Sequence, residues 1–404
     1  MQTDFDVLIV GGGMVGLSLA TSLGQNGFKT LLIEGNTIEP DALHGASGFE
    51  PRVSAITQAS RAWLDKLDVW SNIPNNKISP FTTMEVWDAE GTGEVRFDAT
   101  DVQTSSLGYI IENREIQLAL IKSLKDTPVQ VIEKTKLVGI ELKHEHGEYW
   151  NQITLDDGYS FSCKLVVGAD GQYSKVRELS ELESFNWEYN HQAIVTTITT
   201  ELPHNQCARQ SFAPEGPLGI LPLPGEDQRH CSIVWSATPE FVQLRMAEDD
   251  DAFCKAVTRA TESRLGKVTA VDQRHAIPLA PGIAKTYVKE GIALVGDAAH
   301  RIHPLAGQGV NLGFLDAQEL SNTLSQAIKI NQSPGSEFQL RKYQRNRQAH
   351  NLAMTAAMEG FKRLFESDDL AVRLIRNLGM KHFNQIPFIK NEVMRFAMGT
   401  HVDK

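Results

Sequence analysis

Two glycine-rich stretches near opposite ends of the chain have the residue types and spacing of ligand-binding loops. In the first, Gly11, Gly13 and Gly16 form a GxGxxG pattern between an apolar run and a helical pattern. The first glycine permits a tight turn, the second lets backbone approach a pyrophosphate, and the third lets helix and strand pack closely. Glu34 ends the next apolar run and could accept hydrogen bonds from ribose hydroxyls. Together these residues predict a dinucleotide site.

The second stretch runs from 295 to 313 and contains Asp297, a carboxylate that follows an apolar run and could accept from a ligand hydroxyl. A helical pattern begins within its second part, which contains Gly307, Gln308, Gly309, Val310 and Asn311. A loop that leads into a helix N-terminus presents free N–H groups and a positive dipole end to an anion or an electron-rich ring. An isolated loop of this kind is about as often only a tight connection, so the prediction depends on both stretches together.

The elements that would position these loops follow from the periodicity of the sequence. Buried parallel strands are predicted by apolar runs at 5–10, 30–33, 165–168 and 291–295. Two of the runs end in Gly-Ala-Asp and Gly-Asp, which would place Asp170 and Asp297 at one edge of one sheet. Open α/β sheets bind their ligands at that edge.

A second, antiparallel sheet is predicted by β-branched and alternating runs at 191–200, 208–212, 219–223 and 231–236. We expect this inserted sheet to hold a substrate pocket. A hairpin that interrupts the first lobe is predicted at 83–87 and 94–98, and a small meander at 129–132, 137–142 and 152–155. Helical periodicity returns beyond Ala327, including 340–365.

Length, charge and cysteine content narrow the class of protein. The 404 residues predict two or three lobes, and a net charge of −11 argues against general nucleic-acid binding. No apolar run reaches the ~18 residues of a membrane span and no signal peptide is evident, so we expect a cytoplasmic protein. Buried reduced thiols are expected for Cys163, Cys207, Cys231 and Cys254, which have no CxxC spacing.

Three loops in order, at 11–16, 170–177 and 296–313, resemble those of the FAD-dependent aromatic hydroxylases that share the fold of p-hydroxybenzoate hydroxylase. Within that superfamily the chain is most similar to the ubiquinone-biosynthesis hydroxylases, on the stretches 52–56, 84–88, 111–113, 231–236 and 303–309. The similarity is greatest to members that hydroxylate 2-octaprenylphenol, with the C6 hydroxylase of the methoxy-methyl benzoquinol as the near alternative. Departures from the family pattern occur at Glu50, Gln172 and Arg301, the last of which would make the flavin entrance more basic.

The resemblance implies an α/β (α+β) fold with a Rossmann-like FAD-binding domain formed by 1–75, 100–182 and 275–330. An inserted antiparallel β-sheet domain for the substrate would comprise 76–99 and 183–274, and a C-terminal helical segment 331–404. One FAD would span all three loops, with Glu34 on the adenosine ribose, Asp297 at the ribityl chain and pyrophosphate, and the backbone of 307–311 at flavin N1 and the C2 carbonyl. Further contacts are implied for Arg52, Asn113 and Asp170.

By the same resemblance, NADPH or NADH reduces FAD, the flavin captures O2 as a C4a-hydroperoxide, and the distal oxygen passes to the ring of a polyprenylated phenol. His303 could relay the phenol proton, whereas a structural hydrogen bond is the expected role of His300. No metal is expected, because these two histidines have no third ligand. The apolar wall that excludes water from the flavin would include Pro304 and the run Leu221, Pro222 and Leu223.

Other functions are not excluded by the sequence. A flavoprotein of this fold could act as a reductase or oxidase on another apolar substrate, although the tryptophan-rich motif of the related halogenases is absent. A non-catalytic scaffold that binds partners or lipid would have no need of carboxylates at Glu34, Asp170 and Asp297. Contacts with other ubiquinone-biosynthesis proteins and a homo-oligomer are further expectations.

The segment 370–404 carries six Lys or Arg against two acids, a charge of +4 within a chain of −11. One interpretation is a helix pair that covers the FAD-binding lobe and turns its basic side chains outward. The alternative is a basic, apolar tail that docks the enzyme peripherally on the inner membrane, or on sister enzymes, to draw a polyprenylated substrate from the bilayer. Salt-sensitive binding to anionic vesicles would favour the second.

Overall fold

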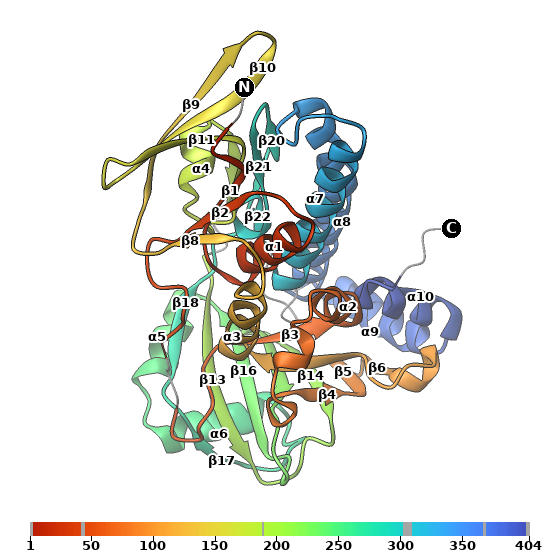
Figure 1. Cartoon of the computed structure of the whole chain (residues 1–404). Helices are drawn as coiled ribbons and strands as arrows, with labels where there is room; N and C mark the ends of the chain where they lie inside the picture. The colour runs from red at the N-terminus through yellow and green to blue at the C-terminus, as the bar shows by residue number, and fades with distance from the viewer. Residues whose placement is uncertain (1–2, 42–44, 188–189, 302–308, 367–368, 401–404) are drawn as a thin grey trace.

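Two eight-stranded sheets and two three-stranded sheets, connected by helices, form the fold in the computed structural model (Figure 1). The structure describes residues 3–41, 45–187, 190–301, 309–366 and 369–400. The fold is mixed α/β, as the sequence predicts, and the largest core cluster surrounds the first large sheet. A separate cluster lies between the second large sheet and the helices at 239–260.

The first large sheet has the strand order β20-β21-β11-β1-β2-β8, with β10 and β9 continuing beside β11. Strand β1 pairs in parallel with both β2 and β11, and β11 pairs in parallel with β21. The two acid-ending runs are therefore neighbours, with Gly168 opposite Leu294. The strands are β1 (Phe5–Val10), β2 (Thr30–Ile33), β8 (Gln130–Ile132), β9 (Leu137–Glu145), β10 (Glu148–Leu155), β11 (Ser160–Gly168), β20 (Val288–Lys289) and β21 (Ile292–Leu294).

The expected meander is wrong in one part. Strands β9, β10 and β11 do form an antiparallel meander, but β8 pairs in parallel with β2, with Val131 opposite Leu32. Helix α3 (Asn113–Leu124) precedes β8 and supplies the crossover that a parallel strand requires. A strand of only three residues carries too little periodicity to reveal which neighbour it joins.

The second large sheet has the order β17-β13-β16-β15-β14-β5-β6, with β18 beside β13. It is antiparallel except where β14 runs parallel to β5, so the predicted hairpin extends this sheet. Helices α5 (Pro239–Ala247) and α6 (Asp250–Ala260) pack on one face (Figure 1). The strands are β5 (Thr83–Asp88), β6 (Glu94–Asp98), β13 (Gln192–Thr200), β14 (Cys207–Ala213), β15 (Gly216–Pro222), β16 (His230–Ala237), β17 (Val268–Val271) and β18 (His275–Pro278).

Two further sheets have three strands each. One contains β3 (Val53–Thr57), β4 (Ser79–Phe81) and β7 (Gly108–Glu112), and the other β12 (Ser184–Asn186), β19 (Gly282–Ala284) and β22 (His300–Arg301). The other helices are α1 (Met14–Gln25), α2 (Gln58–Lys66), α4 (Lys175–Leu179), α7 (Gly309–Lys329), α8 (Glu337–Glu366), α9 (Leu370–Asn384) and α10 (Pro387–Met398). Short 3-10 helices are η1 (Trp70–Asn72), η2 (Asn75–Lys77), η3 (Ala99–Val102) and η4 (Gly296–Ala298).

The C-terminal helix pair packs on the β5–β6 hairpin, and α10 also packs on η3 and Leu107, so the pair covers part of the segment predicted for the FAD-binding lobe and extends beyond it. The expectation that its basic side chains turn outward is wrong for three of them. Arg376 is buried and pairs with buried Asp88 at 2.6 Å, while Arg373 pairs with Glu90 and Lys390 pairs with Asp101. Opposite charges on the hairpin and η3 therefore hold the pair in place.

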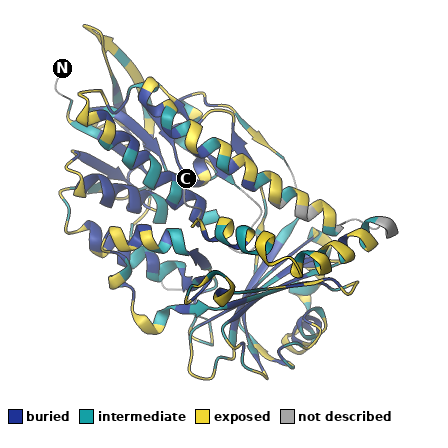
Figure 2. Ribbon diagram, turned by 90° about the vertical axis from the view of Figure 1, so that its right-hand side faces the viewer, coloured by how far each residue is buried: buried dark blue, intermediate teal, exposed yellow. Residues whose placement is uncertain are grey.

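Exposed residues are frequent on the long C-terminal helices and on the β9–β10 hairpin, whereas the central strands β1, β2 and β21 are mostly buried (Figure 2). No helix in the described segments is both long enough and apolar enough to cross a bilayer. The four cysteines are free and buried, as predicted.

Candidate active site

Three loops converge at the N-terminus of α1. Gly11 has a φ of +110°, and a Cβ there would lie 2.4 Å from the carbonyl oxygen of Ala169. A Cβ at Gly16 would lie 2.0 Å from the Gly11 oxygen, so the strand, loop and helix meet backbone to backbone. On the other side, a Cβ at Gly296 would lie 3.3 Å from the Val15 side chain. The structure thus brings together the three glycine or acid loops found in the sequence.

Gly13 differs from its neighbours because open space lies in front of it. It is the N-cap of α1, no side chain caps this helix, and a Cβ would meet no atom within 4 Å. Free N–H groups and the positive dipole end of α1 therefore face the open space, which suits a phosphate. Glu34 supports the loop by accepting from the Gly12 N–H at 2.6 Å and the Asn36 N–H at 2.9 Å.

Asp297 has the properties of a carboxylate that faces a ligand. Burial raises the pKa of its carboxyl, and the charges of His300, Arg301 and Arg52 offset part of that effect. The residue is nevertheless exposed. Both properties hold together when protein surrounds a side chain on most sides and leaves it open on one. A hydroxyl donor on that open side would stabilise the charged form.

Arg52 and Asn113 lie side by side through the backbone, with the Asn113 N–H donating to the Arg52 oxygen at 3.0 Å. Arg52 is exposed, and its guanidinium donates to none of the described residues. The Asn113 Oδ1 accepts from the Ser54 hydroxyl at 2.6 Å, whereas Nδ2 has no acceptor in the described part of the chain. Both side chains therefore keep donors available for a ligand.

Asp170 is turned toward a helix instead of standing clear at the sheet edge. Its Oδ2 accepts from the N–H groups of Lys175 and Val176, at 2.7 and 3.1 Å, and so caps α4. Its Oδ1 is buried and accepts no hydrogen bond within the described structure, and burial raises its pKa. Only this one oxygen remains for the expected cofactor contact.

Asn311 joins the beginning of α7 to β3 through its side chain. Its Oδ1 accepts from the Thr57 N–H at 3.0 Å, and its Nδ2 donates to the Ala55 oxygen at 2.8 Å. It thus pairs with β3 as a neighbouring strand would. A Cβ at Gly309 would meet no atom within 4 Å, and Val310 is partly buried. Outside the described residues lie His303, Pro304, Gly307 and Gln308.

A buried ionic cluster behind the Asp297 loop was not predicted. Asp316, fully buried in α7, pairs with His300 and with Arg347 Nε, the latter at 2.8 Å, and accepts from the Gly296 N–H at 3.1 Å. Burial alone would raise the pKa of Asp316, but His300 and Arg347 outweigh burial and hold that pKa well below its usual range. Asn351 donates to the same carboxylate at 3.2 Å. The expected structural role of His300 is therefore confirmed, and its partner positions Gly296.

Arg301 brings a positive charge close to Asp297 and lowers the pKa of that carboxyl, and hydrogen bonds hold its guanidinium in place. Its guanidinium donates to the oxygens of Ala280 and Gln172, at 2.6 and 2.9 Å, and to Asn186 Oδ1 at 2.8 Å. All three nitrogens are engaged, so Arg301 joins three segments. Arg177 donates to the same Gln172 oxygen at 2.7 Å.

An apolar cavity of about 120 Å³ adjoins this region, between β3, the second large sheet and α10. Leu221, expected in an apolar wall, lines it. Its other lining residues are Ala55, Ile56, Thr57, Phe81, Met84, Phe97, Leu107, Ala208, Arg209, Gln210, Val393, Met394, Ala397 and Met398. Loops that could hold a dinucleotide therefore lie beside an apolar cavity, which is the arrangement of a flavin-dependent monooxygenase. The open N-terminus of α1, the donors of Arg52 and Asn113, and the carboxylate of Asp297 fit FAD.

Comparison with known proteins agrees with this class. The family model described as "FAD binding domain" matches residues 4–358. The chain is 34% identical to 3-demethoxyubiquinol 3-hydroxylase of Escherichia coli K12, over 98% of each chain. It is also 34% identical to ubiquinone biosynthesis monooxygenase COQ6 of Xenopus tropicalis, covering 97% of this chain and 93% of the relative. A third relative, ubiquinone hydroxylase UbiL of Rhodospirillum rubrum, is 34% identical, over 98% of this chain and 90% of its own.

Solved structures support the fold. PqsL, a probable FAD-dependent monooxygenase from Pseudomonas aeruginosa, matches with a TM-score of 0.78 at 21% identity, over 94% of this chain and 99% of its own. The p-nitrophenol 4-monooxygenase PnpA from Pseudomonas putida DLL-E4 matches with a TM-score of 0.77 at 19% identity, over 100% of both chains. The chain is an FAD-dependent monooxygenase. It belongs to the family of ubiquinone-biosynthesis hydroxylases within the FAD-binding proteins.

Proposed function

We propose that the protein hydroxylates the ring of a phenol or quinol that carries an isoprenoid chain, as a step of ubiquinone biosynthesis. The observation that carries this proposal is the direct contact between the loop set and the apolar cavity. Asn311, at the beginning of α7, is bonded to Ala55 and Thr57, and both of these residues line the cavity. A substrate in the cavity therefore lies beside the helix that we expect under the flavin ring.

FAD, when bound, would supply the electron transfer and oxygen activation of the reaction, with NADPH or NADH as its reductant. We propose that Gly13 and the N-terminus of α1 hold the pyrophosphate and that Glu34 accepts from the adenosine ribose. Asp297 would accept from the ribityl chain, and Arg52 would donate to the cofactor. Other proposed contacts are made by Gly11, Gly16, Asn113, Asp170 and the segment 307–311.

Water must be kept from the reacting centre, and the residues around the cavity are suited to that task. Leu221 and Leu223 belong to a buried apolar cluster with Ala55 and Ile110. The proposed catalytic residues are His303, as a proton relay, and Pro304, as part of the apolar wall.

The ring position follows from the relatives only as a proposal. The sequence resemblance favours 2-octaprenylphenol, and the name of the E. coli relative favours a demethoxyubiquinol as the second candidate. Assembly into a homo-oligomer and contacts with other proteins of the pathway stay predictions.

Turnover with both candidates tests this proposal. Purified protein loaded with FAD is mixed with each candidate, NADPH or NADH, and oxygen, and the products are identified by mass spectrometry. The correct substrate should gain one hydroxyl and should accelerate reduction of the flavin in anaerobic stopped-flow experiments. Consumption of reductant that yields only hydrogen peroxide with both candidates would instead assign an oxidase.

A further inference from the structure

The apolar cavity is small compared with a polyprenyl chain. Its volume of about 120 Å³ is near the ~150 Å³ of an engineered cavity that accepts benzene. It can therefore hold one ring edge or a short branched segment, but a longer chain must leave it. The structure indicates where such a chain could leave the cavity.

The opening of the cavity lies along α10. Val393 and Ala397 line the cavity, yet both are exposed, Val393 to 42%. Met394 and Met398 line it from the same helix and are buried, at 4% and 6%. One side of α10 therefore closes the cavity, while the edge at Val393 and Ala397 opens it to the surface.

The helix that bears this opening and its neighbour expose many apolar side chains. In α9, α10 and the turn between them these are Leu374, Ile375, Leu378, Ile386, Phe388, Ile389 and Phe396, of which Ile389 and Phe396 are one helical turn from Val393. Exposed apolar groups on this scale are unusual unless they meet another apolar surface. Three basic residues of the same segment, Arg373, Arg376 and Lys390, pair with carboxylates of the hairpin and η3, so apolar contact is the main property that this surface offers.

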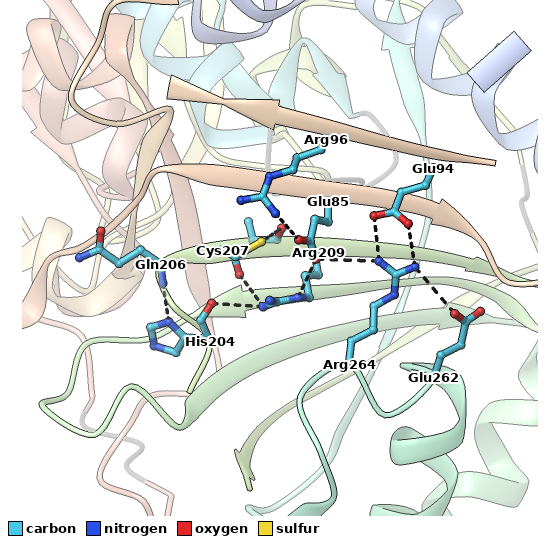
Figure 3. A network of polar contacts seen from close by, with 10 residues as sticks. Glu85, Glu94, Arg96, His204, Gln206, Cys207, Arg209, Glu262 and Arg264 are labelled. Atoms are coloured by element: carbon cyan, nitrogen blue, oxygen red, sulfur yellow. Dashed lines mark hydrogen bonds and ion pairs between the residues drawn. The ribbon is translucent and has the colours of Figure 1, made fainter. Parts of the chain in front are cut away.

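One polar side chain in the cavity has hydrogen-bonding capacity to spare. Gln210 is 5% exposed, and its side chain makes a long hydrogen bond to a described residue, from Nε2 to the Ser211 oxygen at 3.3 Å. Side chains alternate along β14, so Arg209 points to the opposite face, where it pairs with Glu85 (Figure 3). The carboxamide of Gln210 thus lies on the same face of the sheet as Met84 and Ala208 of the cavity wall.

We propose that Gln210 binds an oxygen on the substrate ring and that the apolar chain of the substrate leaves the protein between Val393 and Ala397, onto the apolar surface of α9 and α10. This inference rests on the proposed function and specifies the orientation of its substrate. Gln210 would be a positioning residue for the ring, and α10 would select for the chain. The exposed apolar surface would then let the chain remain in a lipid phase while the ring is at the flavin.

Two variants should separate the ring from the chain. The kinetics of FAD-loaded protein are measured with a phenol that carries an isoprenoid chain and with the same phenol without it. Ala397→Trp, which narrows the opening, should lower kcat/KM roughly tenfold for the chain-bearing phenol, the scale of losing contact with about two CH2 groups, and leave the chain-free phenol unchanged. Gln210→Leu should lower kcat/KM for both phenols. Gln385→Trp, which places the same side chain at an exposed position just before α10, serves as the control.

Equal losses with both phenols in Ala397→Trp, or no loss with either, would overturn the proposed path. FAD content and thermal unfolding show whether each variant is folded, and Ala397→Leu provides a milder change if the tryptophan is not tolerated. Binding of the chain-bearing phenol to the FAD-loaded protein is measured in parallel by equilibrium dialysis. If the wild type hydroxylates neither phenol, the proposed function fails, but weaker binding in Ala397→Trp alone would still support the path.

Discussion

The two large sheets position functional groups in different ways. In the first large sheet, which is parallel at its centre, these groups lie where strands end, and much of the site consists of backbone groups, as at Gly13 and the N-terminus of α1. In the antiparallel sheet they stand in the middle of strands, as Gln210 does in β14. In the sequence, a strand end can be recognised by its glycine and acidic residues. The role of a residue within a strand depends on its neighbours on other strands, which the sequence does not show.

The charged residues near the two sheets also have different roles. On the face of the antiparallel sheet opposite the cavity, Arg96 and Arg209 both pair with Glu85, and Arg264 pairs with Glu94 (Figure 3). The pairs of Glu85 tie neighbouring strands together, and the pair of Arg264 ties the turn after α6 to β6. Beside the first large sheet, the charged side chain of Asp316 is buried behind the Asp297 loop. One set stabilises a sheet, and the other positions a loop.

The largest effect should come from filling the open space in front of α1. Gly13→Trp should fold and lose FAD, because its side chain meets no protein atom near Cβ but occupies the space of a phosphate. FAD content, measured by absorbance after desalting, checks this result. Gly360→Trp is the matched control, since a Cβ there also meets open space, and it should retain FAD. If a folded Gly13→Trp protein kept its full FAD content, this loop would not be the FAD-binding site.

A smaller loss is expected when the buried cluster is neutralised. Asp316→Asn should lower the free energy of unfolding by about 3–5 kcal/mol, because it leaves buried Arg347 without its charge partner. Since the folded-state pKa of Asp316 is depressed, the wild type keeps this stability above the unfolded value of about 3.9 and loses it as the pH falls through the folded pKa. Urea unfolding at neutral pH measures the difference. An effect no larger than that of Asp251→Asn, an exposed pair with Lys255, would contradict it.

Loss of the proposed acceptor at Asp297 should weaken FAD binding by about 1–3 kcal/mol. The raised pKa of this carboxyl adds a pH dependence. Because a ribityl hydroxyl donates to the ionised form, FAD affinity should be greatest above this pKa and fall as the pH falls through it. Titration of FAD release should show this fall in the wild type and not in Asp297→Asn. Equal pH profiles would place the FAD hydroxyls elsewhere.

The smallest effect concerns salt and the apolar surface of α9 and α10. Because Arg373, Arg376 and Lys390 are paired within the protein, binding to lipid vesicles should change little between low and high salt. Phe388→Ser should weaken it, since this side chain is 77% exposed. Sedimentation with anionic and neutral vesicles measures both effects. If high salt abolished the binding, the result would favour electrostatic docking by the segment 370–404.

The parallel sheet and its three loops could be predicted from the sequence, because strand, glycine turn and helix are adjacent in the chain and obey local backbone rules. Asp316 could not, since its partners Arg347 and Asn351 lie 31 and 35 residues away. The signal available was an acid on the same helical face as Leu312 and Leu320. The parallel pairing of β14 with β5 joins residues 124 apart, as between Arg209 and Glu85, and strand periodicity does not specify that neighbour. Gln210 and the α10 opening depend on this pairing.

The central claim is that the protein transfers an oxygen atom from O2 to the ring of a chain-bearing phenol. The direct measurement is turnover of the FAD-loaded protein under isotopically labelled dioxygen, followed by mass spectrometry of the product. We predict that the new hydroxyl carries the label and that product formation requires NADPH or NADH. A product whose new oxygen comes from water, or reductant consumption without any labelled product, would contradict the claim.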